Sequence, residues 1–185
     1  GDILDLESID RKFDIIESVG VLHHMDNPFK GWKVLTSCLN NDSLMLIGLY
    51  SEKARQHIKE IKNKINKLKL QSNYKNIIKF RKDLIENNDN HLNYIKSSPD
   101  FYTVSGVRDL LFHVQEHRFT ISKIKEYLDK LGLIFLGFED QLVKENFKEV
   151  YNNKIDLYNL DKWEEYEKNN PRIFAGMYQF WCKKI

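Results

Sequence analysis

The first candidates for chemistry are two adjacent histidines that follow a short apolar segment near the start of the chain. Residues 13–18 read Phe-Asp-Ile-Ile-Glu-Ser, and His23 and His24 come a few positions later. Because imidazole titrates near neutral pH, His23 could accept a proton from a substrate. The alternative is that one ring packs at the start of a helix while the other faces water. We favour that structural role for at least one of the two.

A second group of chemically capable side chains lies between residues 108 and 118. Within it, His113, Glu116 and His117 follow the H-x-x-E-H spacing found in one family of zinc peptidases. On a helix, imidazoles four residues apart share a face and could bind one metal ion. Such a site also needs a third ligand, usually a distant carboxylate, and short patterns often match by chance. We therefore expect no metal site here.

Two other interpretations of this second group stay open. Its side chains could contact a substrate, with His113 and His117 as further candidate bases. Three charged residues would then be substrate-binding groups: Arg108, Glu116 and Arg118. The same residues could equally form the solvated, salt-bridged face of a helix.

The elements that would position these residues follow from the apolar pattern. Residues 13–18 are typical of a strand, and Asp26-Asn27-Pro28 of the capped start of a helix. A turn at residues 40–43 precedes a nearly continuous apolar strand at 44–50. This order predicts a βαβ unit with parallel strands. Open α/β sheets bind ligands beyond the carboxyl ends of their strands, so Tyr50 is a candidate substrate contact, although it could equally belong to the core.

The rest of the chain predicts helices and two more strands. Residues 51–118 form a mainly helical insertion, with a helix over 105–117. For the block of about fifty residues that opens it, residues 51–99, we expect no separate core. Arg55 and Tyr102 in this insertion are further candidate substrate contacts. The later elements are a helix that Thr120 caps and Gly132 ends, a strand at 133–138, a second helical insertion at 140–170 and a strand at 173–182.

Charge and composition limit the classes of function. The net charge of +2 is too small to require a nucleic-acid or membrane partner. Residues 53–82, however, hold eleven Lys or Arg against the single acidic residue Glu60. We favour a solvated lysine-rich helix face for this basic arm, with nucleic-acid binding as the less favoured alternative. The two cysteines have no metal-type spacing, and no signal peptide or membrane segment is visible, so we expect a cytoplasmic protein without a membrane partner.

The segments at residues 13–16 and 21–25 resemble the fourth strand and the following loop of class I S-adenosylmethionine-dependent methyltransferases. Residues 40–49 resemble the fifth strand of that family and its preceding turn, although the family's usual Lys-Pro-Gly-Gly turn is replaced by Asn-Asn-Asp-Ser. Residues 119–138 resemble the helix and sixth strand. The segment Arg108–Arg118 is similar to a branch of the family that is often joined to tetratricopeptide repeats.

This resemblance implies a partial Rossmann-like α/β fold, the second half of a seven-stranded sheet. The strand at 13–18 would lie at one edge, followed by the strand at 44–50, an antiparallel final strand and the strand at 133–138. The resemblance also implies cofactor contacts from five residues: Asp2, Ile3, Ser18, Val19 and Gly20. The family's glycine-rich loop and ribose-binding acid have no counterpart, so we expect these 185 residues alone to bind S-adenosylmethionine weakly or not at all.

The resemblance implies methyl transfer from S-adenosylmethionine to an unknown acceptor by the intact protein, with this fragment inactive alone. The alternative is a non-catalytic α/β interaction module that acts through its basic helical arm. An open apolar edge strand invites pairing with another chain, so we predict a homodimer through that edge or through the arm.

Overall fold

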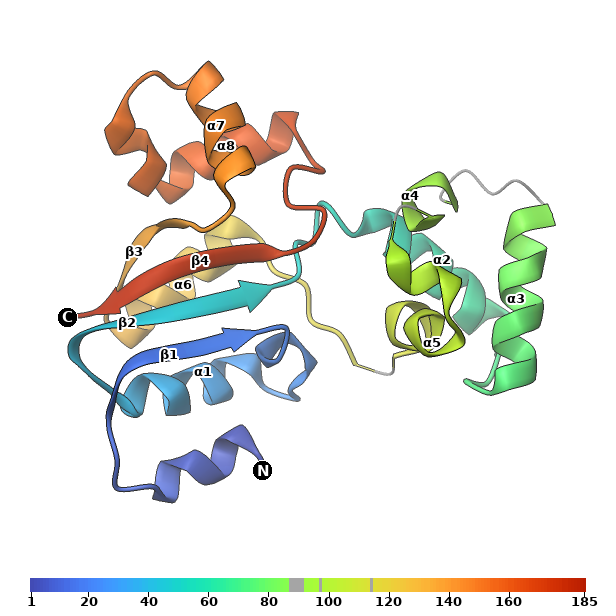
Figure 1. Cartoon of the computed structure of the whole chain (residues 1–185), viewed down its shortest axis with the longest axis horizontal. Coiled ribbons are helices and arrows are strands. Elements are labelled where there is room, and N and C mark those ends of the chain that lie inside the picture. The colour runs from blue at the N-terminus through green and yellow to red at the C-terminus, as the bar shows by residue number, and fades with distance from the viewer. Residues whose placement is uncertain (87–91, 97, 114) are drawn as a thin grey trace. The chain divides into compact units, whose positions relative to one another are not determined.

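The computed structural model describes residues 1–86, 92–96, 98–113 and 115–185, except for the side chain of Leu92. The chain divides into two compact units (Figure 1). The sheet unit comprises Gly1–Ala54 and Gln115–Ile185, and the helical unit comprises Arg55–Val114. Among the described residues, no helix is both long enough and apolar enough to cross a membrane.

A four-stranded mixed sheet forms the centre of the sheet unit. Its strands are β1 (Phe13–Val19), β2 (Leu39–Leu49), β3 (Leu133–Phe138) and β4 (Tyr178–Lys184), in the spatial order β1-β2-β4-β3. β1 and β2 run parallel, and β4 is antiparallel to both β2 and β3. The predicted βαβ unit, the predicted strand order and the α/β fold class are confirmed.

The helices of the sheet unit begin and end where their local sequence directs. The Asn27 side chain accepts a hydrogen bond from the Lys30 amide at 3.1 Å, with Pro28 in the first turn. Thr120 accepts from the Lys123 amide at 3.2 Å, and Gly132 ends that helix at φ +65°. The helical elements of this unit are η1 (Ile3–Ser8), η2 (Leu22–His24), α1 (Pro28–Ser37), α6 (Ile121–Leu131), α7 (Gln141–Val150), η4 (Lys154–Tyr158) and α8 (Leu160–Asn169).

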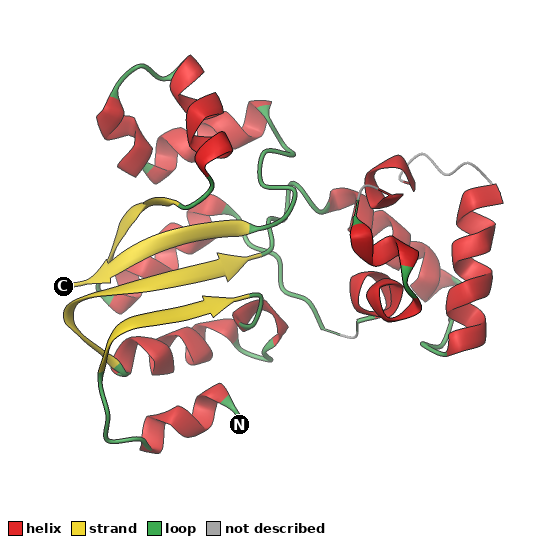
Figure 2. Ribbon diagram, viewed as in Figure 1, coloured by secondary structure: helices red, strands yellow, loops and turns green. Residues whose placement is uncertain are grey.

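The core of the sheet unit lies between the sheet and the helices α1 and α6, which Figure 2 shows on the same side of the strands, and it extends to α7 and α8. Met45, Ile47 and Leu49 alternate along β2 toward this side and are fully buried. Trp32 of α1 packs against Phe180 of β4 with ring centroids 5.9 Å apart. The opposite face of the sheet holds the less buried residues of the same strands.

Two strand boundaries differ from the prediction. β2 begins at Leu39, because Leu39 already pairs with Phe13. The predicted turn at 40–43 is part of this strand, where the pairing shifts register and Asp42 has φ +60°. β4 begins at Tyr178 rather than at residue 173. The preceding residues close local turns instead, with the Ile173 amide donating to the Asn170 carbonyl at 3.0 Å.

The helical unit has an apolar cluster of its own, so the expectation that this insertion lacks a core was wrong. Its elements are α2 (Gln56–Lys67), α3 (Tyr74–Glu86), α4 (Leu92–Lys96), η3 (Pro99–Tyr102) and α5 (Val104–Phe112). The cluster includes one stripe of α2 and residues of α3 and α5: Ile58, Ile61, Ile65, Ile77, Phe80, Val107 and Leu111. α2 and α3 bury their apolar sides here, whereas Lys64, Lys67, Lys75 and Lys79 of the same two helices are exposed.

Candidate functional site

The carboxyl ends of β1 and β2 approach each other very closely. The Gly20 amide donates to the Gly48 carbonyl at 3.3 Å. A Cβ at Gly48 would lie 2.7 Å from Val19 Cγ1 and 2.9 Å from Val19 Cα, so only glycine fits this position. Gly20 has φ +79°, and a Cβ there would meet no heavy atom within 4 Å. The backbone at Gly20, just beyond the end of β1, is therefore open. Three of the predicted cofactor contacts lie here: Ser18, Val19 and Gly20.

An aromatic cluster follows directly beyond these strand ends. The His23 ring stacks on the Tyr50 ring with centroids 3.8 Å apart, and His24 meets His23 edge-on at 4.4 Å. His23 is fully buried, whereas His24 and Tyr50 are partly exposed. The structure therefore brings together His23 and Tyr50, which the sequence proposed separately as a base and a substrate contact.

An extended segment, residues 115–119, lies along the same strand ends and closes the cluster. The His117 amide donates to the His23 carbonyl at 2.8 Å, and the Phe119 amide donates to the Tyr50 carbonyl at 2.8 Å. His24 Nδ1 lies 3.0 Å from the Gln115 carbonyl oxygen. The backbone of this segment thus holds His117 beside His23 and Tyr50. We call His23, His24, Tyr50, Gln115 and His117 the strand-end cluster.

The predicted helix over residues 105–117 was wrong in its second half. α5 ends at Phe112, and His113 caps it with extended backbone angles, φ −62° and ψ 129°. His113 and His117 therefore do not share a helix face, and the geometry assumed for the H-x-x-E-H pattern is absent. Glu116 instead pairs with Arg118, with Oε1 and Nη1 3.8 Å apart, and the Glu116 side chain is only 3% exposed.

The other sequence candidates lie elsewhere. Asp2 caps η1 by accepting a hydrogen bond from the Leu4 amide at 2.9 Å, and Ile3 packs partly buried against the core of the sheet unit. Arg55, Tyr102, Arg108 and His113 belong to the helical unit. Within it Arg55 is 6% exposed, whereas Tyr102 is 66% exposed and lies edge-on to Phe101. No observation tests the role assigned to any of these residues.

Sequence reasoning missed two residues at the strand ends, Gln115 and Glu167. Nothing in the sequence distinguishes Gln115, because its place depends on the early end of α5. Glu167 did leave a signal. It follows Leu160 and Trp163 at helical spacing, so a carboxylate occupies a position on the apolar side of α8.

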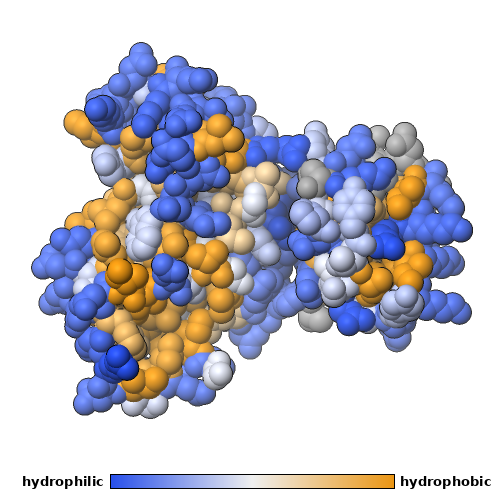
Figure 3. Space-filling model, viewed as in Figure 1, coloured by the Kyte–Doolittle hydropathy of each residue, from blue (hydrophilic) through white to orange (hydrophobic). Residues whose placement is uncertain are grey.

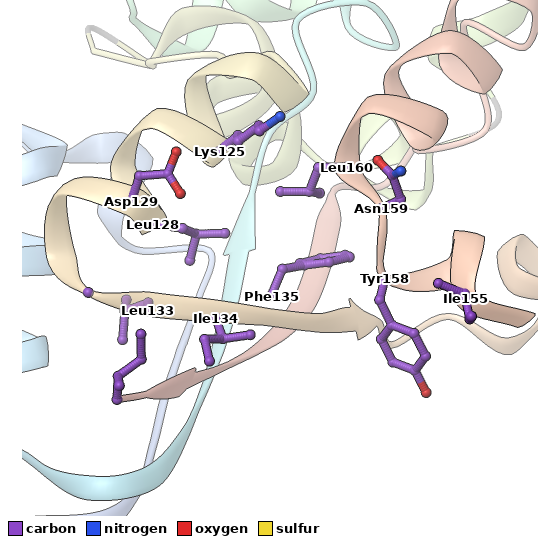
Figure 4. A pocket seen from close by; sticks show the side chains of 12 residues that line it. Lys125, Leu128, Asp129, Leu133, Ile134, Phe135, Ile155, Tyr158, Asn159 and Leu160 are labelled. Atoms are coloured by element: carbon purple, nitrogen blue, oxygen red, sulfur yellow. The ribbon is translucent and has the colours of Figure 1, made fainter.

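A groove of the sheet unit lies at the other end of the strands. It has a volume of about 610 Å³ and borders Gly132, Leu133 and Ile185, at the amino end of β3 (Figure 4). Its lining contains none of the sequence candidates. A smaller groove of about 210 Å³ borders Phe138, Glu139 and Met177, at the carboxyl end of β3. Ligands of open α/β sheets bind at carboxyl ends, so we take the strand-end cluster and not the larger groove as the candidate site.

Comparison with known proteins defines the fold. No protein-family model matches the sequence. An uncharacterized protein from Synechococcus sp. is 25% identical over 146 residues, which cover 75% of this chain and 35% of that protein. The structure of PKMT2 from Rickettsia typhi matches 100% of this chain and 37% of its own, with a TM-score of 0.70 at 15% identity.

The structure of PKMT2 from Rickettsia typhi in complex with AdoHcy matches with a TM-score of 0.64, again at 15% identity, over 38% of its chain. AdoHcy, S-adenosylhomocysteine, is what remains of S-adenosylmethionine once its methyl group has been transferred. The chain spans between 35% and 38% of the length of these relatives. It shares the α/β fold of the part of PKMT2 that it matches, which agrees with the partial Rossmann-like fold that the sequence resemblance implied.

Proposed function

We propose that residues 1–185 form the acceptor-side part of an S-adenosylmethionine-dependent methyltransferase, and that the complete gene product containing them transfers a methyl group to an acceptor. One observation carries the proposal. The strand-end cluster gathers three imidazoles and a phenol at the carboxyl ends of β1 and β2, in a fold shared with a protein whose structure holds AdoHcy.

The residues at the end of β1 fit a ligand of this kind. The backbone beside Gly20 is open, and Ser18 Oγ is buried with no hydrogen-bond partner among the described residues. S-adenosylmethionine would supply a methyl group bonded to a sulfonium sulfur. The neutral thioether left behind is a good leaving group, so the methyl group is already activated for transfer. The remaining tasks of the protein are to align the acceptor and to remove a proton when the acceptor carries one.

We assign the proton-accepting role to His117 rather than to His23. His23 is fully buried and its ring is covered by Tyr50, whereas His117 is partly exposed. His23 would then support Tyr50, and Tyr50 would border the acceptor. Glu116 and Arg118 flank His117 as an ion pair and would contribute charge next to the acceptor.

The test is methyl transfer from tritiated S-adenosylmethionine by the complete gene product to candidate acceptor proteins. For a general base we expect His117→Asn to lower kcat by roughly 10²–10⁴-fold. His57→Asn, in the helical unit, is the matched control, and His113→Asn tests the remaining sequence candidate. A complete gene product that binds no AdoHcy and transfers no methyl group would contradict the proposal. Residues 1–185 alone should bind AdoHcy weakly by calorimetry, and tight binding would contradict that part alone.

A second function is favoured by the uneven charge of the two units. Residues 55–114 contain twelve Lys and Arg against six Asp and Glu, a net charge of +6, whereas the rest of the chain carries −4. Exposed lysines on α2 and α3 would attract an acidic partner.

We therefore propose, as the alternative, a non-catalytic interaction module that acts through this basic arm. Charge reversal at Lys67, Lys75 and Lys79, all exposed, should abolish partner binding. The same reversal at Lys148, Lys154 and Lys168 of the sheet unit is the matched control. Binding that survives the first set, or that requires AdoHcy, would count against the module.

A further inference from the structure

Glu167 is a fully buried carboxylate in the sheet unit. It lies on α8 in line with the core residues Leu160 and Trp163, and its side chain has no exposed surface. Burying a charge costs several kcal/mol unless partners compensate it, on the order of the penalties measured for buried ions. The contacts of this carboxylate must therefore compensate the cost of burying it.

Those contacts join three parts of the sheet unit. Glu167 Oε1 accepts hydrogen bonds from Ser51 Oγ at 2.8 Å and from Tyr178 Oη at 2.6 Å. Glu167 Oε2 lies 3.5 Å from Lys53 Nζ. Burial, together with the charge of Glu167, raises the pKa of the Tyr178 phenol, so the phenol keeps its proton and donates it.

The hydroxyl of Ser51 is the contact nearest the strand-end cluster. Ser51 follows Tyr50 directly, and its Oγ also accepts a hydrogen bond from the Ala54 amide at 3.1 Å. The backbone on both sides of Ser51 pairs with residues 115–119, because the Phe119 amide donates to the Tyr50 carbonyl and the Glu52 amide donates to the Phe119 carbonyl, each at 2.8 Å. Glu167 thus holds the turn to which both Tyr50 and the His117 segment are attached.

Tyr178 supplies the second fixed point. It is the first residue of β4 and pairs with Leu49, the last residue of β2. One carboxylate oxygen therefore bonds to both the turn after β2 and the strand beside it. Because hydrogen bonds to a charged group are stronger than those between neutral groups, this arrangement restricts the direction in which residue 50 leaves the sheet.

We propose that Glu167 is a positioning residue, which holds Tyr50 against His23 through Ser51 and so sets the geometry of the strand-end cluster. The functional meaning of this geometry rests on the proposed methyl transfer. The positioning itself does not, and it can be measured without a cofactor or an acceptor.

The test is an NMR measurement of the imidazole signals of His23 in the full chain, with Glu167→Gln as the main variant. The substitution keeps the volume and removes the charge. If Glu167 positions Tyr50, the His23 signals should shift away from their stacked values, because the ring current of Tyr50 acts on a ring 3.8 Å away. Ser51→Ala, which removes only the hydrogen bonds of the hydroxyl, should shift the same signals in the same direction.

Glu165→Gln, an exposed position on the same helix, is the matched control and should leave the His23 signals unchanged. A merely structural role would lower the melting temperature without moving these signals. Unchanged His23 signals in a folded Glu167→Gln would therefore overturn the proposal. Should Glu167→Gln not fold, unchanged signals in Ser51→Ala would overturn it equally. Shifted His23 signals, together with a complete gene product that transfers no methyl group, would leave the positioning intact and remove the proposed function alone.

Discussion

At the scale of single residues, Gly48 fixes how closely β1 and β2 approach. Its missing side chain leaves room for both the backbone and the side chain of Val19. This close approach lets the Gly20 amide reach the Gly48 carbonyl and places the open backbone at Gly20 beyond the sheet. The identity of one buried residue therefore determines the shape of the strand end.

A methyl group at Gly48 should destabilise the sheet unit. In Gly48→Ala the new Cβ would lie 2.7 Å from Val19 Cγ1 and 3.0 Å from Met177 Sδ, so β1 must move. We expect a loss of about 1–3 kcal/mol in the free energy of unfolding, measured by urea denaturation. Gly176→Ala is the control, since a Cβ there meets nothing within 4 Å. Equal stability of the two variants would contradict this account of the strand end.

Cys182 allows a second test at this scale. Burial at the centre of β4 raises the pKa of its thiol to about 12 from an ordinary value near 9. The folded chain therefore favours the neutral thiol. The contribution of Cys182 to the free energy of unfolding is fully present below pH 9 and is lost as the pH rises from 9 toward 12. We expect alkylation of Cys182 by iodoacetamide to stay slow between pH 7 and pH 9 in the native protein, because the thiolate is the reactive form.

Peptide mass spectrometry can follow this alkylation at Cys182, with the urea-unfolded chain as the control. In the unfolded chain, labelling should accelerate steeply over the same pH range. Rapid labelling of native Cys182 at pH 8 would mean that β4 is not covered as described.

At the scale of elements, the sequence determined more of the sheet unit than of the strand-end cluster. Strands at 13–18 and 133–138 were predicted because their apolar runs are short and bounded by turns, and α6 because Thr120 and Gly132 act locally. These signals lie within a few residues of what they specify. The end of α5 has no such signal, so the predicted helix continued to residue 117.

The physical reason for that error lies in long-range backbone pairing. The amides of His117 and Phe119 donate to carbonyls of His23 and Tyr50, which are far away in the sequence. A helix that continued to residue 117 would have used the His117 amide internally, and tertiary context overrode helix propensity. The composition of the strand-end cluster could be guessed in part, but its assembly depends on these pairings. The sequence places Glu167 on the apolar side of α8, but its partners Ser51 and Tyr178 could not be predicted for the same reason.

Proline at residue 117 tests this pairing directly. His117→Pro removes the amide that donates to the His23 carbonyl at 2.8 Å. We expect a destabilisation of about 1–3 kcal/mol, the cost of a buried carbonyl left without its donor, measured by thermal and urea unfolding. His117→Ala keeps the amide and should cost distinctly less. If both variants lose the same stability, the side chain and not the backbone of His117 anchors the segment.

At the scale of the whole molecule, one face of the sheet carries apolar residues that no described helix of the sheet unit covers. Ile15 of β1 is 58% exposed and Ile134 of β3 is 48% exposed, and the partly exposed Leu44 and Leu46 lie between them. Figure 3 shows hydrophobic residues gathered over this face. Parallel strands in α/β proteins are usually covered on both faces, so this face and the free edge of β1 are suited to contact another polypeptide.

We therefore predict that residues 1–185 form a homodimer, either through the free edge of β1 or through the basic arm. Ile15→Lys should shift the mass toward the monomer in size-exclusion chromatography with light scattering, because a lysine on an edge strand opposes strand pairing without disturbing the core. Leu142→Lys, at an exposed apolar position on α7 away from the sheet edges, is the matched control. Loss of the dimer on charge reversal at Lys67, Lys75 and Lys79, but not in Ile15→Lys, would assign the interface to the arm. A wild-type chain that stays monomeric at high micromolar concentration would contradict both routes to a dimer. The apolar face would then be exposed to solvent in the monomer.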